Sequence, residues 1–82
     1  MNALKLYALF LRRLVGFFNT HKVESVRNTL SDLSAATNMS FNQISVARKF
    51  AEQNDMPFPP LLTKEEVLRR VKDLDVLAEQ LG

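Results

Sequence analysis

The chain has 82 residues, of which 46% are hydrophobic, and a net charge of +2, so we expect one folded domain with a small core and not a disordered segment. It holds no cysteine, which excludes disulfides, cysteine-ligated zinc and thiol nucleophiles. Its single histidine, His21, cannot form a metal site alone, and no strand-type alternation is visible, so we expect an all-α fold without metal or cofactor.

Residues 3–18 predict a first helix that is apolar around almost its whole circumference. Its apolar residues are Leu4, Leu6, Tyr7, Leu9, Phe10, Leu11, Leu14, Val15, Phe17 and Phe18. A helix of this kind is buried, or lies against a partner or a membrane. We expect it to form the centre of the core and to contact a second chain in part, with binding to a membrane surface as an alternative.

The same helix lacks the features of a membrane span or a signal peptide. Its uninterrupted apolar run, 6–11, is much shorter than the roughly 20 residues that cross a bilayer. Arg12 and Arg13 follow this run, whereas the basic residues of a signal peptide precede it. We therefore expect a cytoplasmic protein without a transmembrane segment.

A linker is expected at residues 19–21, and a second helix over 22–37. Four apolar residues recur at helical spacing on one face: Val23, Val26, Leu30 and Leu33. The alternative is a break near Asn28-Thr29. The spacing alone does not decide between one long helix and two elements.

The second helix is expected to end in a tight turn at 37–39, and a third helix to follow over 40–54. Asn38 is suited to a left-handed backbone position in this turn. Ser40 and Gln43 form a capping-box pattern, in which each side chain bonds to the other residue's backbone N–H. The third helix is expected to face inward through Ile44, Ala47 and Ala51, with Phe41 and Phe50 beside them. Two helices joined this closely predict a helix-turn-helix over 30–50.

This segment resembles the helix-turn-helix of Cro- and repressor-like regulators, small DNA-binding proteins of phage or plasmid type. The family pattern places an apolar and then a small residue in the first helix, where this chain has Leu33 and Ser34. Met39 stands at the apolar position after the turn, and the second helix supplies Ile44 and Ala47 at two more.

Two positions depart from the family pattern. Asn38 stands where the turn usually has glycine, and Thr37 stands where an apolar residue is usual. The asparagine is sterically acceptable, because its short side chain tolerates the left-handed backbone. The match covers about a quarter of the chain, from Leu30 to Phe50.

The resemblance implies that the third helix enters the major groove of DNA and touches base edges with its N-terminal residues. The residues expected to contact DNA are Ser40, Asn42, Gln43, Ser45, Val46, Arg48 and Lys49. Asn and Gln can bond adenine through two atoms, and Lys suits guanine or phosphate. Phosphate contacts are expected from Arg12, Arg13, Lys22 and Arg27. The alternative interpretation of the same residues is a solvated polar face.

The basic residues are unevenly distributed along the chain. Residues 1–22 contain four and no acidic residue, 23–54 contain three of each sign, and 55–82 are net acidic. Phosphate neutralisation supplies most non-specific affinity for DNA. The segment expected to read DNA is neutral by itself, so it needs the basic residues of the first part of the chain on the same surface.

Three closely spaced prolines predict a stiff, extended connector over 56–62. Its apolar residues, Met56, Phe58, Leu61 and Leu62, are expected to lie over the core. Docking of this segment into a groove of another protein is the alternative.

A last helix is expected over 63–81, begun by a second capping box at Thr63 and Glu66. An apolar seam follows it, formed by Val67, Val71, Leu74, Ala78 and Leu81 and widened by Leu68 and Leu77. This seam is either the fourth side of the core or a dimer contact.

The sequence thus predicts a single domain, 1–82, with four helices at about 3–18, 22–37, 40–54 and 63–81. No catalytic constellation is visible, so we expect no enzyme. The predicted function is a sequence-specific DNA-binding transcriptional regulator that acts as a homodimer, paired through helix 3–18 or the 67–81 seam. The alternative is a small protein–protein adaptor or inhibitor that binds through the first helix or the 56–62 connector.

Overall fold

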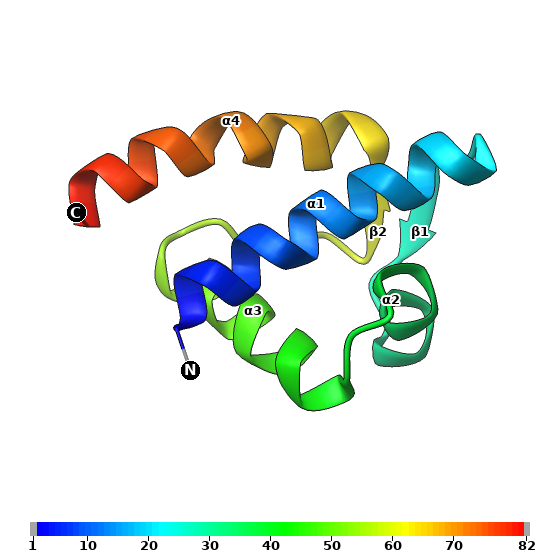
Figure 1. Cartoon of the computed structure of the whole chain (residues 1–82), viewed down its shortest axis with the longest axis horizontal. Coiled ribbons are helices and arrows are strands. Elements are labelled where there is room, and N and C mark those ends of the chain that lie inside the picture. Colours follow the sequence, from blue (N-terminus) through cyan, green and yellow to red (C-terminus); the bar gives the residue numbers. More distant parts are fainter. Residues whose placement is uncertain (1, 82) are drawn as a thin grey trace.

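The computed structural model describes the backbone of residues 2–81 and the side chains of residues 2–77 and 79. In chain order its elements are α1 (Ala3–His21), β1 (Ser25–Arg27), α2 (Leu30–Thr37), α3 (Phe41–Gln53), β2 (Leu61–Thr63) and α4 (Lys64–Leu81) (Figure 1). The fold is therefore mostly helical, as expected, with one small two-stranded sheet that the sequence pattern did not predict.

Helix α1 is longer than predicted, because residues 19–21 belong to it. The side chain of Asn2 caps its start by accepting from the backbone N–H groups of Leu4 and Lys5. The helix ends at His21 and is capped by Lys22, whose backbone is left-handed with a φ of 54°. The expectation of a linker at 19–21 was therefore wrong.

The helix predicted over 22–37 was wrong in its first half, and the alternative break near Asn28-Thr29 is the observed one. Residues 25–27 form β1, which pairs antiparallel with β2 and sets Val26 opposite Leu62. Valine favours strands, although the spacing of Val23 and Val26 also fits a helix, and a partner strand from a distant part of the chain decides in favour of the strand. Helix α2 then begins at Leu30, capped by Thr29, whose side chain accepts from the backbone N–H of Asp32.

The turn between α2 and α3 has the local structure that the sequence predicts. Asn38 is left-handed, with φ 57° and ψ 35°, and its backbone N–H donates to the carbonyl of Ser34. Ser40 and Gln43 form both bonds of the capping box at the start of α3. Thr37, at the position where the family pattern usually has an apolar residue, is buried. Its hydroxyl donates to the carbonyl of Leu33 at 2.7 Å, so the buried polar group has a hydrogen-bond partner.

The proline-rich connector lies over the core, as expected, but not with all of its apolar residues. Met56 and Phe58 pack against the core and Leu62 is fully buried. Leu61 is 50% exposed, because neighbouring residues of a strand point to opposite faces and Leu62 takes the inner one.

Helix α4 shows half of the predicted capping box. The hydroxyl of Thr63 accepts from the backbone N–H of Glu66, but the Glu66 carboxylate forms ion pairs with Arg69 and Arg70 of its own helix. The ion pairs replace the capping bond to the backbone N–H of Thr63, because a carboxylate is attracted more strongly to a nearby guanidinium of opposite charge.

The inner face of α4 differs from the predicted seam in part. Val67 and Leu77 are buried and Val71 and Leu74 are half-buried, whereas Leu68 is exposed and does not widen the seam. Arg70 takes a buried place on the same face. The side chains of Ala78 and Leu81, also predicted for the seam, lie outside the described residues.

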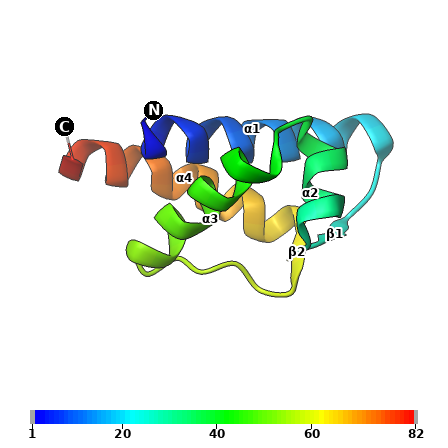
Figure 2. The ribbon, with the colours of Figure 1, turned by 90° about the horizontal axis from the view of Figure 1, so that it is seen from below.

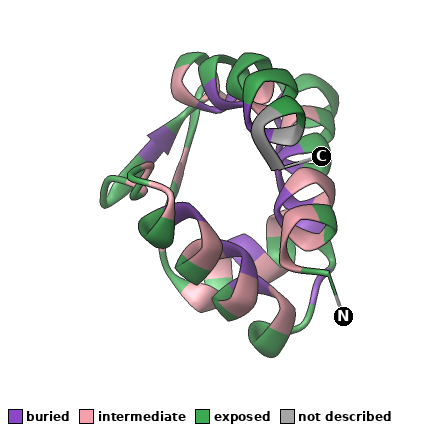
Figure 3. Ribbon diagram, turned by 90° about the vertical axis from the view of Figure 1, so that its left-hand side faces the viewer, coloured by how far each residue is buried: buried purple, intermediate pink, exposed green. Residues whose placement is uncertain are grey.

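Helix α1 is the central element of the fold, packed against α2, α3 and α4. Its buried residues are Tyr7, Phe10, Leu11, Leu14 and Phe18. Figure 2, a view from below Figure 1, shows α1 and α4 running side by side, with α3 crossing in front of them. Figure 3 shows the buried segments of α1, α3 and α4 turned toward one another, with α3 and α4 on different sides of α1. The two outer helices thus present separate surfaces.

Candidate nucleic-acid interface

The outer face of α3 carries a row of polar side chains near the start of the helix. Asn42, Ser45 and Lys49 are exposed, and they stand three and four residues apart, which places them on one side of the helix. Val46 and Arg48 flank this row and are half-buried. The opposite side of α3 packs into the core through Ile44, Ala47 and Ala51. The row is therefore rigidly oriented away from the core.

Ser40 and Gln43, two further candidates, are engaged in the start of the helix. The Ser40 hydroxyl accepts from the Gln43 N–H at 3.1 Å, and the Gln43 Oε1 accepts from the Ser40 N–H at 3.0 Å. These bonds occupy the carbonyl oxygen of the Gln43 amide. Bidentate bonding to adenine needs both the oxygen and the nitrogen of an amide, so Asn42 is better placed for it than Gln43.

A shallow groove of about 320 Å³ runs beside this row, between α3 and the start of α2. It is lined by Leu30, Ser45, Arg48, Lys49 and Glu52. Two cations and one carboxylate therefore border it. The positive charge suits a phosphate, and the Glu52 carboxylate opposes one.

Arg13 lies at the turn between α2 and α3 and has a structural partner there. Its guanidinium donates to the carbonyl oxygens of Thr37 at 3.0 Å and Asn38 at 3.3 Å. The charge therefore sits at the C-terminus of α2, where the helix dipole favours a cation. This ties α1 to the turn and keeps a positive charge beside the start of α3.

The other three arginine and lysine candidates do not gather around α3. Arg12 lines a groove between α1 and α4, on a different side of α1 from α3. Lys22 is exposed at the far end of α1. The Arg27 Nε lies 2.9 Å from the Asp32 carboxylate, so that its charge is locally balanced. Of the expected phosphate contacts, Arg13 is the one that the fold brings to the turn.

Phe41 is a residue of this surface that the sequence pattern placed wrongly. It was expected beside the inner face of α3, and it is 51% exposed. As the first residue of α3 it lies directly after the Ser40 cap, where the helix is only beginning to pack. The sequence signal that could have indicated its exposure is its position directly after the Ser40 cap, at the first residue of the helix.

A second polar cluster lies inside the molecule, beneath the connector. Arg70 is 6% exposed, and its guanidinium donates to the carbonyls of Met56 and Pro57 and pairs with Glu66 at 3.0 Å. The Phe58 ring centroid lies 4.4 Å from its central carbon. The nearby Tyr7 hydroxyl is buried, and burial raises the pKa of this group, an effect that Arg70 partly opposes. These contacts hold the connector on the core and involve no exposed surface of α3.

The described residues show no metal centre and no membrane span. No three histidine or acidic side chains among them are grouped as metal ligands would be. No described helix combines the length and the apolar character needed to cross a bilayer. The five fully buried apolar residues of α1 face the core, so the apolar circumference of this helix is largely used inside the fold.

Comparisons with protein-family models, with curated proteins and with solved structures find no match to this chain.

Proposed function

We propose that the chain is a sequence-specific DNA-binding regulator that reads the major groove with α3. The observation that supports this most directly is the exposed row of Asn42, Ser45 and Lys49 on a helix whose start is fixed by a left-handed turn and a capping box. α2, the turn and α3 act as a helix-turn-helix, with α2 lying across the DNA backbone.

The row offers chemically distinct contacts to base edges. The Asn42 amide can bond adenine through both its oxygen and its nitrogen, Ser45 can bond a base or a phosphate, and Lys49 can bond guanine. Phe41, exposed beside Asn42, offers an apolar contact for the methyl group of thymine. Phe41 and Asn42 together favour an A·T pair opposite the start of α3.

The charges around α3 predict modest, salt-dependent binding. Lys49 belongs to the row, Arg48 flanks it and Arg13 lies at the turn before α3, whereas the Glu52 carboxylate opposes their charge. With about three phosphate contacts per chain, the logarithm of the binding constant should fall with the logarithm of salt with a slope of about −3. A slope near zero would contradict this arrangement.

The deciding experiment selects binding sites from random duplexes and measures fluorescence anisotropy on the selected site. Asn42→Ala should weaken binding to it by about 1–3 kcal/mol and relax the preference at one base pair. Asn42 is preferred to Gln43 for this test because Gln43→Ala would also remove the cap. Asn19→Ala, an exposed asparagine at the far end of α1, is the matched control and should bind normally.

If selection enriches no sequence, and Asn42→Ala and Asn19→Ala behave alike on every duplex, the proposal is rejected. Lys49→Ala should weaken binding to all duplexes about equally, because a phosphate contact carries no sequence information. Lys72→Ala on the exposed side of α4 is its control.

A protein adaptor that binds through the connector is the second candidate, and the fold gives it less support. Met56 and Phe58, the residues that would enter a partner's groove, already pack against the core, and Arg70 holds the backbone between them. Only Leu61 and the exposed prolines remain on the outside. Capture of one protein partner that is lost in Leu61→Asp, without any DNA binding, would favour this candidate.

A further inference from the structure

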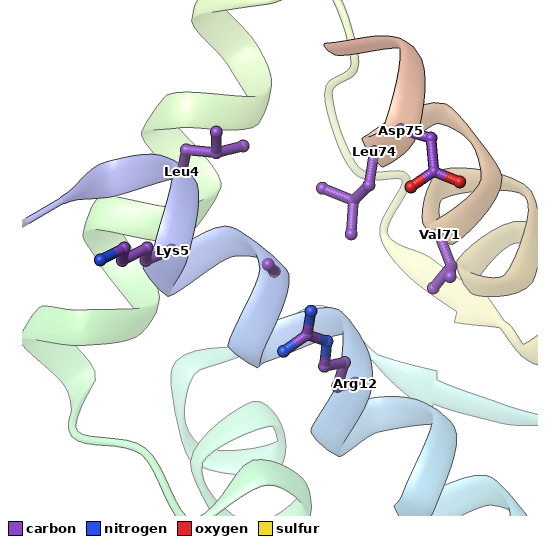
Figure 4. Close-up of a pocket in the computed structure, with 7 residues that line it drawn as sticks. Leu4, Lys5, Arg12, Val71, Leu74 and Asp75 are labelled. Atoms are coloured by element: carbon purple, nitrogen blue, oxygen red, sulfur yellow. The ribbon is translucent and has the colours of Figure 1, made fainter. Parts of the chain in front are cut away.

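A groove of about 310 Å³ lies between α1 and α4, on a different side of α1 from α3 (Figure 4). Its lining is Leu4, Lys5, Ala8, Arg12, Val71, Leu74 and Asp75. Leu74 points toward α1, and Arg12 points into the space between the two helices. The groove thus has an apolar floor with charged side chains at its edges.

The lining follows one stripe of each helix. On α1 the groove residues Leu4, Ala8 and Arg12 are spaced four apart, and on α4 Val71, Leu74 and Asp75 are spaced three and one apart. The two helices run in opposite directions, with the start of α1 beside the later part of α4. An antiparallel helix pair with an uncovered apolar stripe between its members is half of a four-helix bundle.

The two edges of the groove carry opposite charge. The α1 edge has Lys5 and Arg12, and the α4 edge has Asp75. None of these three side chains takes part in an ion pair among the described residues. The same separation holds over the longer segments, because residues 1–22 contain four basic residues and no acid, whereas 55–82 are net acidic.

We propose that a second copy of this chain covers this groove, with α1 of each copy lying on α4 of the other around a two-fold axis. A two-fold interface joins the same patch on both subunits, so the patch must complement itself. A basic edge on one helix and an acidic edge on the antiparallel helix meet this requirement, because the rotation places each basic edge on the partner's acidic edge.

The apolar residues supply the rest of the contact. Leu4, Ala8, Val71 and Leu74 of both copies meet at the centre, as in the core of a helix bundle. The small side chain of Ala8 allows a close approach of the partner helix. The proposed dimer depends on the groove and its charges, and it stands whether or not α3 binds DNA.

The test is analytical ultracentrifugation of the full chain over a range of concentrations at low and high salt. The wild-type chain should dimerise, more weakly as salt rises. Arg12→Glu and Asp75→Arg should each raise the dimer dissociation constant about tenfold or more, because each places like charges at both edges of the two-fold contact. Circular dichroism confirms that both variants fold, and Arg69→Glu on the outer side of α4 should dimerise normally.

An equimolar mixture of Arg12→Glu and Asp75→Arg chains decides the mode of pairing. Each variant alone is repelled by its own copies. In the mixed dimer the two substituted side chains face each other with opposite charges, and the native Arg12 of one copy faces the native Asp75 of the other. The mixture should therefore form heterodimers with an affinity near that of the wild type.

Three results would overturn the proposal. The first is a wild type that stays monomeric, and the second is a pair of variants that dimerise like the wild type. The third is rescue by the double variant in one chain but not by the mixture, because the charges would then act within a chain.

Discussion

Arg70 shows how one buried charge organises the connector. Its guanidinium lies beneath 56–58, donates to two backbone carbonyls, pairs with Glu66 and stacks on the ring of Phe58. The prolines at 57, 59 and 60 have no backbone N–H, so this segment cannot be held by a regular hydrogen-bonded ladder. A side chain from α4 supplies the donors in its place.

Truncation of this side chain should therefore be costly. Arg70→Ala should lower the free energy of unfolding by about 2–4 kcal/mol, because it leaves two backbone carbonyls without donors and opens a cavity beneath Phe58. Urea denaturation measures the change. Arg69→Ala is the matched control: it removes the other partner of Glu66, but Arg69 is exposed, so the change should stay within about 0.5 kcal/mol. Equal changes in the two variants would contradict the role of Arg70.

Tyr7 gives the fold a pH dependence at the alkaline end. Burial raises the pKa of its hydroxyl above the usual 10.0, and the buried oxygen has no hydrogen-bond partner among the described residues. Below pH 10 the hydroxyl is protonated in both states. As the pH rises past 10, the unfolded chain releases this proton while the folded chain keeps it, so the free energy of unfolding falls until the pH exceeds the folded-state pKa.

Tyr7→Phe should remove this loss. At neutral pH the variant should be about as stable as the wild type, since it deletes a buried hydroxyl that has no partner. Between about pH 9 and 11 the wild type should lose stability relative to the variant. Urea denaturation at several pH values measures the free energy of unfolding of both proteins. In the difference between them, the contributions of all other titrating groups cancel. Parallel pH profiles for the two proteins would exclude Tyr7 as the source.

At the scale of elements, the sequence predicted best those local structures whose hydrogen bonds join residues close together in the chain. The Asn38 turn and the Ser40–Gln43 capping box depend on bonds that span four residues or fewer, and both are confirmed. Strand β1 could not be predicted, because its partner β2 lies in a distant part of the chain and the valine spacing fits a helix equally well. The orientation of Phe41 was missed for the same reason, since burial at a helix start depends on the neighbouring elements.

The short sheet gives a matched pair of leucines that tests its orientation. Leu62→Ala should lower the free energy of unfolding by about 2–4 kcal/mol, because Leu62 is fully buried opposite Val26. Leu61→Ala should change it by no more than about 0.5 kcal/mol, because half of that side chain is exposed. Denaturant midpoints compare the two. The reverse order would mean that β2 presents its other face to the core.

At the scale of the molecule, α1 joins the other helices into one cooperative unit. Its buried residues belong to a single cluster with Leu33 of α2, Ile44 of α3 and Val67 of α4. The ring of Phe10 lies 5.5 Å from the ring of Phe58, centroid to centroid, so the same helix also supports the connector. We therefore expect the described part of the chain to unfold in a single transition.

Phe10→Ala tests this cooperativity. The variant should lose about 3–5 kcal/mol and still unfold in one step, with the same midpoint by far-ultraviolet circular dichroism and by tyrosine fluorescence. Fluorescence is informative because the chain has one tyrosine, Tyr7, in the core, and no tryptophan. Phe41→Ala, the exposed control, should cost no more than about 1 kcal/mol. Separate midpoints for the two probes would show that the elements unfold independently.

The sequence by itself determined the Ser40–Gln43 capping box, the turn before it, the helical regions of α1, α3 and α4 and the row of polar residues on α3, because these depend on propensities and bonds within a few residues. Only the tertiary structure decided that residues 25–27 form a strand, that Arg70 lies beneath the connector, and that Arg13 and Arg12 lie at different surfaces. It also placed Lys5, Arg12 and Asp75 around one groove. These features bring together residues that are far apart in the chain. Their stability depends on how the helices pack, which the pattern of neighbouring residues in the sequence does not show.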